Sequence, residues 1–298
     1  MTRVTEHLAH SHHMIDYFVT DVDGCLATPF QEPDWDILSK LRAYHQQARE
    51  DRQNKKPSPY PLLSICTGRP LAYTEALAQW LGIRTPFIFE SALLFDLDSY
   101  QVKGAATNRT SWTNANPQAI HSQKTVGDFE LDSFSSLSSH PGVQDIEQVK
   151  QWFLHDVVAR YPEMSIEFAK ILDAGLVCHD PSLVDKVEKE TAHYLEKQGL
   201  THLEIHTTDV SINVLLGGNN KGLGLKLLAN QFNTPLGQIA YIGDSSGDIP
   251  ALDLVGYPFT PSNARAIVRQ QDGYQHLASQ TTASVLEAYE HCVKLNMS

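Results

Sequence analysis

Two aspartates, Asp21 and Asp23, directly follow an apolar segment of the chain, in the sequence YFVTDVDGCL. The segment from Met14 to Val19 is interrupted only by Asp16, and such a run is typical of a strand that is buried on both faces of a sheet. Ligands of open α/β sheets bind at the carboxyl ends of the strands, which is where Asp21 lies. In an extended backbone Asp23 points to the same side. Two carboxylates this close repel each other, and a hard divalent cation such as Mg²⁺ would relieve that repulsion.

The same pair of acids also fits other kinds of site. Asp-x-Asp pairs occur at many strand ends that carry no chemistry, so the pair alone does not assign a function. The pair also resembles the start of a calcium-binding EF-hand loop, which needs an acid or amide at its fifth position and glycine at its sixth. Those positions hold Cys25 and Leu26, so we exclude an EF-hand.

A second predicted strand, from Pro61 to Cys66, ends at Thr67, Gly68 and Arg69. A hydroxyl group and an exposed backbone at a strand end can donate hydrogen bonds to an anion. The alternative is an ordinary turn into a helix, where threonine is a good N-cap. The sequence leaves both interpretations open.

A lysine and a second pair of acids occur late in the chain. Lys221 precedes a predicted helix, and it does not belong to a nucleotide P-loop, because Gly222 follows it where that loop requires serine or threonine. Asp244 and Asp248 follow a predicted strand over 238–242. The hydroxyl, the lysine and the two pairs of acids therefore all lie at strand ends or one turn beyond, where they would suit one phosphate and one metal ion.

The elements that position these residues alternate along the chain. We expect strands over 14–19, 61–66, 86–89, 238–242 and 257–260, and helices over 35–50, 71–81, 223–232, 249–255 and 284–295. Strands that alternate with helices at this spacing predict an α/β fold, a Rossmann-like, doubly wound parallel sheet.

The middle of the chain has a different pattern. We expect helices over 143–161 and 183–197 and strands over 165–169, 175–179, 202–206 and 210–216, whereas much of 103–141 reads as a loop. Helices on an antiparallel sheet indicate an inserted α+β cap domain, which we place at 92–216, with the core formed by 1–91 and 217–298.

The composition excludes several classes of partner. The formal net charge of −12 argues against nucleic acid or an anionic membrane as the main partner. No apolar stretch approaches the roughly 20 residues of a membrane span. The four cysteines form no CxxC pair, which suits a reducing compartment, and we expect a cytoplasmic protein. Histidines cluster near the start of the chain, and we expect a solvated arm rather than a metal site there (His7, His10, His12 and His13).

Four short motifs, in this order, resemble the haloacid dehalogenase superfamily of phosphatases. The similarity is greatest to the Cof-type branch, which includes sucrose-phosphate and mannosyl-3-phosphoglycerate phosphatases. The matching segments are Asp21-Val22-Asp23-Gly24-Cys25, Thr67-Gly68-Arg69, Asn220-Lys221-Gly222 and Gly243-Asp244-Ser245-Ser246-Gly247-Asp248. Two residues depart from the pattern, because Cys25 replaces a threonine and Gly247 replaces an asparagine. Glu90-Ser91 is similar to a Glu-Asn pair of the mannosylphosphoglycerate enzymes.

The resemblance implies a mechanism and a role for each matching residue. Asp21 would be the nucleophile that forms an aspartyl phosphate, and Asp23 would be the general acid and then the general base, protonated at the start. Mg²⁺ would be bound by the Asp21 side chain, the Asp23 backbone carbonyl and Asp244, and Asp248 would orient metal-bound water or Lys221. Phosphate would be bound by Thr67, Gly68 and Lys221. The substrate would be bound by Arg69 and Asn220. The absence of the asparagine at Gly247 would weaken Mg²⁺ binding about 10–100-fold.

The resemblance also implies that the cap selects a small phosphorylated metabolite, a sugar phosphate or a similar compound. Residues near the ends of the cap strands are candidates for contacting it (Lys170, His179, His206 and Asp209). Two alternatives remain: a catalytically weak relative that binds a phosphorylated ligand or a protein partner, and transfer to an acceptor other than water, as in a mutase. The late position of the insertion favours the phosphatase.

Overall fold

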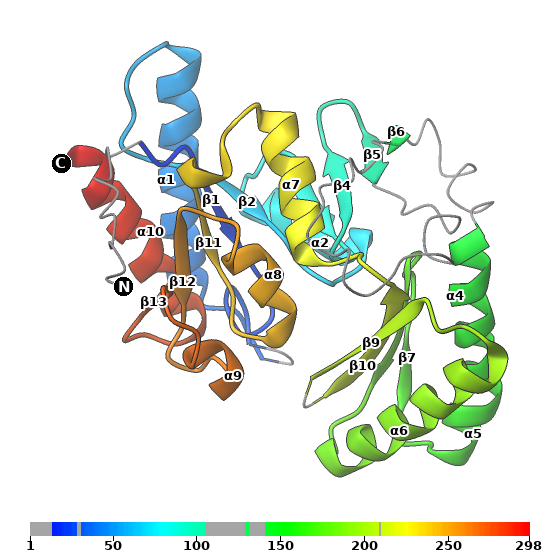
Figure 1. Cartoon of the computed structure of the whole chain (residues 1–298). Helices are drawn as coiled ribbons and strands as arrows, with labels where there is room; N and C mark the ends of the chain where they lie inside the picture. Colours follow the sequence, from blue (N-terminus) through cyan, green and yellow to red (C-terminus); the bar gives the residue numbers. More distant parts are fainter. Residues whose placement is uncertain (1–13, 29–30, 105–128, 131–140, 209) are drawn as a thin grey trace, which may run out of the picture.

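A parallel five-stranded sheet forms the centre of the molecule (Figure 1). The computed structural model describes residues 14–28, 31–104, 129–130, 141–208 and 210–298. The strand order is β13-β12-β11-β1-β2. The bounds are β1 (Tyr17–Thr20), β2 (Leu62–Ile65), β11 (Ile239–Ile242), β12 (Tyr257–Thr260) and β13 (Gln275–His276). All four residues of β1, β2 and β11 are buried, as expected for the inner strands of a sheet that is covered on both faces.

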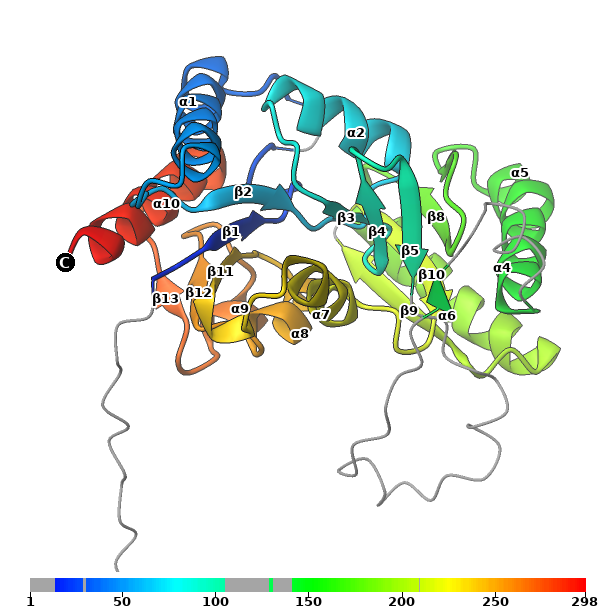
Figure 2. The ribbon, with the colours of Figure 1, turned by 90° about the horizontal axis from the view of Figure 1, so that it is seen from above.

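Helices cover both faces of this sheet (Figure 2). On one side lie α1 (Trp35–Gln53), α2 (Leu71–Trp80) and α10 (Thr281–Met297), and on the other side lie α7 (Lys221–Phe232), α8 (Ile249–Leu252) and α9 (Ala266–Arg269). The face that α1 buries repeats at helical spacing and carries Leu38, Leu41 and His45. The start of α1 is capped by Asp34, whose side chain accepts a hydrogen bond from the Ile37 amide at 3.0 Å. The predicted doubly wound α/β fold is confirmed.

A second, antiparallel sheet adjoins the central one next to β2. Its order is β3-β4-β5-β6, with β3 (Phe87–Phe89), β4 (Leu93–Asp96), β5 (Gln101–Gly104) and β6 (Phe129–Glu130). A single parallel bridge between Cys66 and Ile88 joins β3 to the end of β2. The third strand of the predicted core therefore begins a new sheet, in which β3 pairs along its whole length with β4.

The cap contains a third sheet, which is antiparallel and is covered by helices on one face. The sheet has the order β7-β8-β10-β9, and the helices lie on the face that points away from the core (Figure 1). The bounds are β7 (Ser165–Glu167), β8 (Asp173–Val177), β9 (Leu203–Thr208), β10 (Ser211–Leu216), α4 (Pro141–Trp152), a π-helical segment (Phe153–Val157), α5 (Val158–Arg160) and α6 (Pro181–Gln198). The rings of Trp152 and Tyr194 stack at 4.1 Å between their centroids and so join α4 to α6.

The topology bears on where the inserted domain begins. The sequence placed the insertion at 92–216, but β4 and β5 pair with β3, which follows the core strand β2. We therefore propose that the cap consists of 141–216, with β4 and β5 attached to the core.

Several expected elements differ at their edges. The helix expected over 143–161 is interrupted by the π-helical segment, and the strand expected over 165–169 ends at Glu167, because Ala169 has a φ of 68°. The next strand begins at Asp173 rather than at residue 175. The histidines of residues 1–13, Asp209 and most of 103–141 lie outside the described residues.

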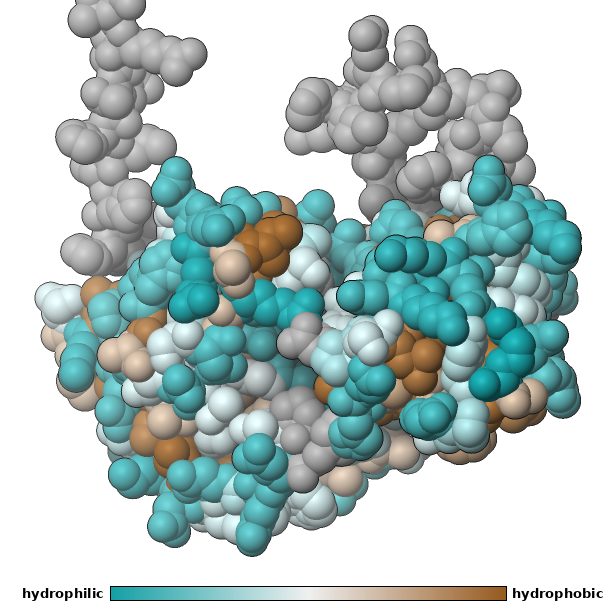
Figure 3. Space-filling view, turned by 90° about the horizontal axis from the view of Figure 1, so that it is seen from below, coloured by the Kyte–Doolittle hydropathy of each residue, from teal (hydrophilic) through white to brown (hydrophobic). Residues whose placement is uncertain are grey.

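The surface is mostly hydrophilic, and hydrophobic side chains form small, separate patches on the face shown in Figure 3. Among the described residues, no helix combines the length and the hydropathy that a membrane span requires.

Candidate active site

Asp21, Lys221 and Asp248 form a buried row of charges at the carboxyl end of the central strands. The ammonium nitrogen Nζ of Lys221 lies 2.8 Å from Asp21 Oδ1 and 2.7 Å from Asp248 Oδ1. Asp21 directly follows β1, and Lys221 opens α7, whose first turn is capped by the Asn220 side chain through the Leu223 amide at 3.0 Å. The side chain predicted at Asn220 to bind substrate therefore holds the helix that presents Lys221.

Asp248 is fully engaged by protein donors. One of its oxygens accepts the Tyr241 hydroxyl at 2.6 Å as well as Lys221, and the other accepts the Ser245 amide at 2.9 Å and the Ser245 hydroxyl at 2.8 Å. Burial tends to raise the pKa of Asp248, but the charge of Lys221 and these hydrogen bonds outweigh it, so the pKa is lowered. Asp248 is thus held ionised and fixes Lys221, which is one of the two roles that the sequence predicted for it.

Asp21 and Asp244 bring carboxylate oxygens close together beside Cys25. The ligand atoms of these three residues all lie within 4.8 Å of one another. Burial and repulsion from Asp248 raise the pKa of Asp21 well above its usual value, and the same two causes raise the pKa of Asp244 to about 7. Burial likewise raises the pKa of the Cys25 thiol, which stays protonated and is a poor ligand for a hard cation. Two neighbouring carboxylates, Asp21 buried and Asp244 partly exposed, fit a divalent cation such as Mg²⁺.

Gly24 allows this approach of the two acids. Its φ is +80°, in the left-handed region, and a Cβ added to it would collide with Asp244 Oδ2. The backbone carbonyl of Gly24 also accepts a hydrogen bond from Asn263 Nδ2 at 2.9 Å, which fixes the turn from the other side. The glycine of the first motif is therefore required by the position of Asp244.

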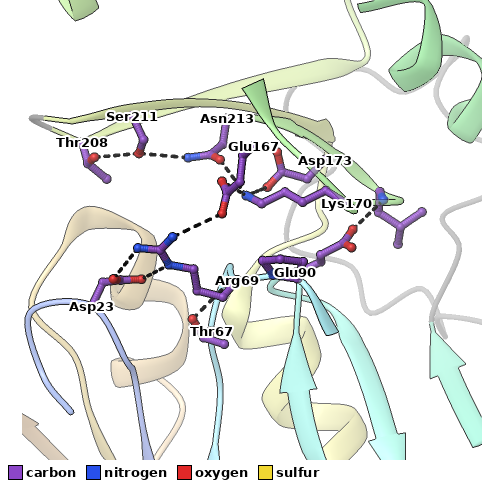
Figure 4. A network of polar contacts seen from close by, with 12 residues as sticks. Asp23, Thr67, Arg69, Glu90, Glu167, Lys170, Asp173, Thr208, Ser211 and Asn213 are labelled. Carbon is purple, nitrogen blue, oxygen red and sulfur yellow. Dashed lines mark hydrogen bonds and ion pairs between the residues drawn. The ribbon is translucent and has the colours of Figure 1, made fainter. Parts of the chain in front are cut away.

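Asp23 is bound by Arg69 across the mouth of the site (Figure 4). The guanidinium donates two hydrogen bonds of 2.7 Å each to the two carboxylate oxygens of Asp23, and its third nitrogen lies 3.5 Å from Glu167 of the cap. The two parallel hydrogen bonds fix the orientation of the Asp23 carboxylate. Arg69 was predicted to bind substrate, and the motif spacing did not indicate that its side chain reaches Asp23.

Thr67 and Gly68 lie beside this pair, and both line the cavity described below. The Thr67 hydroxyl oxygen accepts the Arg69 amide at 3.2 Å, which leaves its hydrogen to donate to a ligand. The predicted phosphate-binding residues Thr67, Gly68 and Lys221 thus border one space with Asp21.

The cap contributes a second charged cluster that faces the core. The Lys170 ammonium lies 2.7 Å from Glu167 Oε2, 2.9 Å from Asp173 Oδ2 and 2.9 Å from Asn213 Oδ1 (Figure 4). The Lys170 side chain is 3% exposed, so this cation is almost fully enclosed by its partners. The Asn213 amide continues the network to the Ser211 hydroxyl at 3.2 Å.

A cavity of about 440 Å³ lies between the core site and this cap cluster. Its walls carry residues of both parts, including Asp21, Asp23, Asp244, Lys221, Glu167, Lys170, Asp173, His206, Ser211 and Asn213. Of the candidate cap residues, Lys170 and His206 line the cavity, His179 is not among the lining residues, and Asp209 lies outside the described part of the chain. A volume of this size suits a small organic ligand.

Sequence reasoning missed four residues of the site: Tyr241, Glu167, Asp173 and Asn213. Tyr241 had a detectable signal, because a tyrosine inside a buried strand needs a partner for its hydroxyl. The other three come from separate cap strands, and only the antiparallel register brings them together.

Comparison with known proteins identifies this arrangement. A sequence model of the haloacid dehalogenase-like hydrolases matches residues 18–287. A phosphoglycolate phosphatase from Methanothrix thermoacetophila is 32% identical over 83 residues, which are 28% of this chain and 37% of that protein. The alignment therefore spans little more than a third of the relative's length.

Solved structures share the fold over almost the whole chain. The sucrose-phosphatase from Synechocystis sp. PCC6803, crystallised with sucrose and phosphate, superposes with a TM-score of 0.60 at 15% identity and covers 94% of this chain and 98% of its own. The Thermoplasma acidophilum protein 0175 superposes with a TM-score of 0.62 at 18% identity, covering 95% of this chain and 100% of its own.

Proposed function

Since the chain belongs to the haloacid dehalogenase-like hydrolases, we propose that it is a Mg²⁺-dependent phosphatase that hydrolyses a phosphate monoester through an aspartyl phosphate. The observation that carries the proposal is the buried row Asp21–Lys221–Asp248 beside Asp244, open to the same cavity as Asp23 and Thr67. A nucleophile, a fixed cation, an acid and a hydroxyl donor border one space. Phosphoryl transfer depends mainly on such positioning and neutralisation of charge.

In the first half of the reaction, an Asp21 oxygen attacks phosphorus and the bond from phosphorus to the leaving oxygen breaks. Asp23 gives its proton to that oxygen. Lys221 and the Thr67 hydroxyl hold the phosphoryl oxygens, and Asp248 keeps Lys221 in place. Mg²⁺ bound by Asp21 and Asp244 would supply further charge neutralisation at the phosphoryl group.

In the second half, water attacks phosphorus of the aspartyl phosphate and the bond from phosphorus to the Asp21 oxygen breaks. Asp23, now ionised, accepts the proton of the water. The hydrogen bonds from Arg69 keep the Asp23 carboxylate in place for this step. For the first half, the substrate must displace part of the Arg69 pair so that Asp23 can carry a proton.

The polar cap cluster supports a neutral, hydroxyl-rich leaving group such as a sugar. The cluster has two negative charges, on Glu167 and Asp173, and one positive charge, on Lys170. Asn213 and Ser211 add further oxygens. Hydroxyl groups can donate to these acceptors, whereas a carboxylate would meet net negative charge. We therefore favour a sugar phosphate or a similar metabolite over a substrate with a second acidic group.

We also propose a cytoplasmic location, because the four cysteines are all free thiols, as expected in a reducing compartment.

Release of inorganic phosphate from a panel of monoesters, with Mg²⁺ and with EDTA, tests the proposal. The panel includes hexose and disaccharide phosphates and also phosphoglycolate. We expect metal-dependent release that Asp21→Asn abolishes. The matched control is Asp16→Asn, which removes a carboxylate from the same segment where it pairs with Arg52. More than a few per cent of activity in Asp21→Asn would refute the nucleophile assignment.

A catalytically weak relative that binds a phosphorylated ligand is the second candidate, and Gly247 in the cavity wall is the observation that favours it. That function predicts binding of phosphate, detected by calorimetry, with no release from any monoester in Mg²⁺.

A further inference from the structure

The buried carboxylate of Glu90, a core residue, binds backbone amides of the cap. It follows β3 and is 3% exposed. Its oxygens accept the Ile171 amide at 2.8 Å and the Leu172 amide at 2.6 Å (Figure 4). Both donors belong to the cap segment between β7 and β8. One side chain therefore satisfies two backbone amides of the opposite part of the molecule.

The backbone of Glu90 is attached to the loop that carries Thr67 and Arg69. The Glu90 amide donates to the Arg69 carbonyl at 3.0 Å, and the Ser91 amide donates to the Thr67 carbonyl at 2.9 Å. Both Glu90 and Ser91 have positive φ, 44° and 64°, a conformation that non-glycine residues seldom adopt. A costly backbone conformation persists where surrounding contacts hold it, as these hydrogen bonds do.

The two amides that Glu90 binds lie between Lys170 and Asp173, two members of the polar cap cluster. Lys170 is adjacent to Ile171, and Asp173 is adjacent to Leu172. Lys150 of the cap also holds this segment, because its Nζ donates to the Lys170 carbonyl at 2.6 Å. The direction in which Lys170 and Asp173 enter the cavity thus depends on where Glu90 fixes the backbone between them.

Glu90 itself is not among the residues that line the cavity, so it does not touch the ligand there. Burial raises the pKa of Glu90 to about 7, while the amides of Leu172 and Ile171 and the charge of Lys170 favour the carboxylate. An ionised carboxylate accepts both amides, whereas a neutral acid or amide would place a donor against one of them.

We propose that Glu90 is a positioning residue that determines selectivity for the leaving group, by fixing Lys170 and Asp173 of the cap relative to Thr67 and Arg69 of the core. The inference rests on the proposed phosphatase function. It assigns Glu90 no part in phosphoryl transfer: its effect reaches the substrate only through the cap cluster.

The first test compares two monoesters in Glu90→Gln. One is the best sugar phosphate of the panel, and the other is p-nitrophenyl phosphate, which has no hydroxyl groups to bind the cluster. We expect kcat/KM for the sugar phosphate to fall about 10–100-fold, mostly through KM, because small misplacements of binding groups have effects of this size. For p-nitrophenyl phosphate we expect a change below about threefold. Equal losses on both monoesters, or no loss on either, would overturn the proposal.

The matched control is Glu190→Gln. Glu190 is a carboxylate of the cap that accepts hydrogen bonds from Arg160 and Tyr161, away from the cavity. It should leave the kcat/KM of both monoesters unchanged.

The second test is independent of activity. Hydrogen exchange of the Ile171 and Leu172 amides should become at least about tenfold faster in Glu90→Gln and remain unchanged in Glu190→Gln. Unchanged exchange in Glu90→Gln would contradict the positioning role. If the wild-type protein releases no phosphate from any monoester, the proposed function fails, and the exchange measurement still decides whether Glu90 fixes this segment.

Discussion

Arg69 and Asp23 form a bidentate ion pair in which both hydrogen bonds measure 2.7 Å, at the place where the core meets the cap. The same guanidinium lies 3.5 Å from Glu167 of the cap and stacks over the Tyr73 ring at 5.3 Å. A residue that the sequence assigned to substrate binding thus holds the proposed acid and also contacts the cap. In the proposed mechanism, the entering substrate displaces part of the Arg69 pair, and Asp23 can then carry the proton that it gives to the leaving oxygen.

Asp23→Asn separates the two halves of the proposed reaction. The amide can neither protonate the leaving oxygen nor accept a proton from water, so the aspartyl phosphate should accumulate on a monoester whose leaving group needs no acid. We expect kcat to fall at least about 100-fold. Intact mass measurement should detect a phosphorylated protein after mixing with p-nitrophenyl phosphate. Absence of any phosphoenzyme at that lowered rate would count against the two-step scheme.

Arg69→Lys retains the positive charge but loses the planar fork that binds both oxygens of Asp23. We expect kcat/KM to fall about 10-fold or more, because neither Asp23 nor Glu167 remains oriented. Steady-state kinetics on the best monoester measures the loss. Arg84→Lys, the same change outside the cavity-lining residues, serves as the control. Wild-type kinetics in Arg69→Lys would show that the fork has no role.

Lys221→Met removes the cation between Asp21 and Asp248. Two buried carboxylates then lack compensation, so we expect a loss of about 3–5 kcal/mol in the free energy of unfolding. We expect kcat to fall at least about 100-fold in the variant that remains folded. Lys226→Met, on the exposed side of the same helix, is the control for both measurements. Denaturant unfolding and phosphate release give the two values, and a stability equal to that of the control would contradict the assigned role.

The pH dependence of stability tests the raised pKa of Asp244. The pKa of Asp244 is raised from 3.8 to about 7, so between these pH values the folded, metal-free protein binds more protons than the unfolded chain. Its contribution therefore favours folding at low pH and is lost as pH rises through about 7.

We accordingly expect that, in EDTA, lowering the pH from about 8 to about 5 stabilises the wild-type protein more than Asp244→Asn, by about 1 kcal/mol or more. Glu90 shifts in the same direction in both proteins and cancels from this difference. Mg²⁺ should reduce the difference by stabilising the ionised form. Equal pH dependence of the two proteins in EDTA would argue against a raised pKa of Asp244.

Gly247→Asn restores the side chain that the family pattern carries. A Cβ at Gly247 would meet only the Ser245 hydroxyl, at an ordinary 3.6 Å, so the backbone position accepts a side chain without a clash at its Cβ. We expect apparent Mg²⁺ affinity to rise about 10-fold, in line with the effect of groups that orient metal ligands. Gly237→Asn, where a Cβ has open space outside the cavity, is the control. Calorimetric titration with Mg²⁺ that gives one affinity for all three proteins would contradict this.

The convergence of the core residues was predictable because strands of a parallel sheet end at one edge. Asp21, Thr67 and Asp244 each follow a buried apolar run, and β1 lies between β2 and β11 in the sheet. The cap was less predictable: Lys170 and Asp173 are close in the chain, but Asn213 joins them only through an antiparallel register that no short motif specifies. The Arg69–Glu167 contact and the hydrogen bonds of Glu90 to Ile171 and Leu172 depend on how the cap sits on the core. No periodicity in the sequence carries that information.

The strand order of the central sheet has a consequence for the way in which the molecule acquires its structure. β1 is completed on one side by β2, which follows soon after it, and on the other by β11, which follows the whole cap. The cap strands β9 and β10, in contrast, are neighbours in the chain and pair at once. Loop closure over a long separation is slow, so we expect the cap to reach its structure as a local unit before β11 docks beside β1. Until then one edge of β1, the strand that precedes Asp21, is unpaired, and an unpaired edge of this kind is exposed to aggregation during biosynthesis.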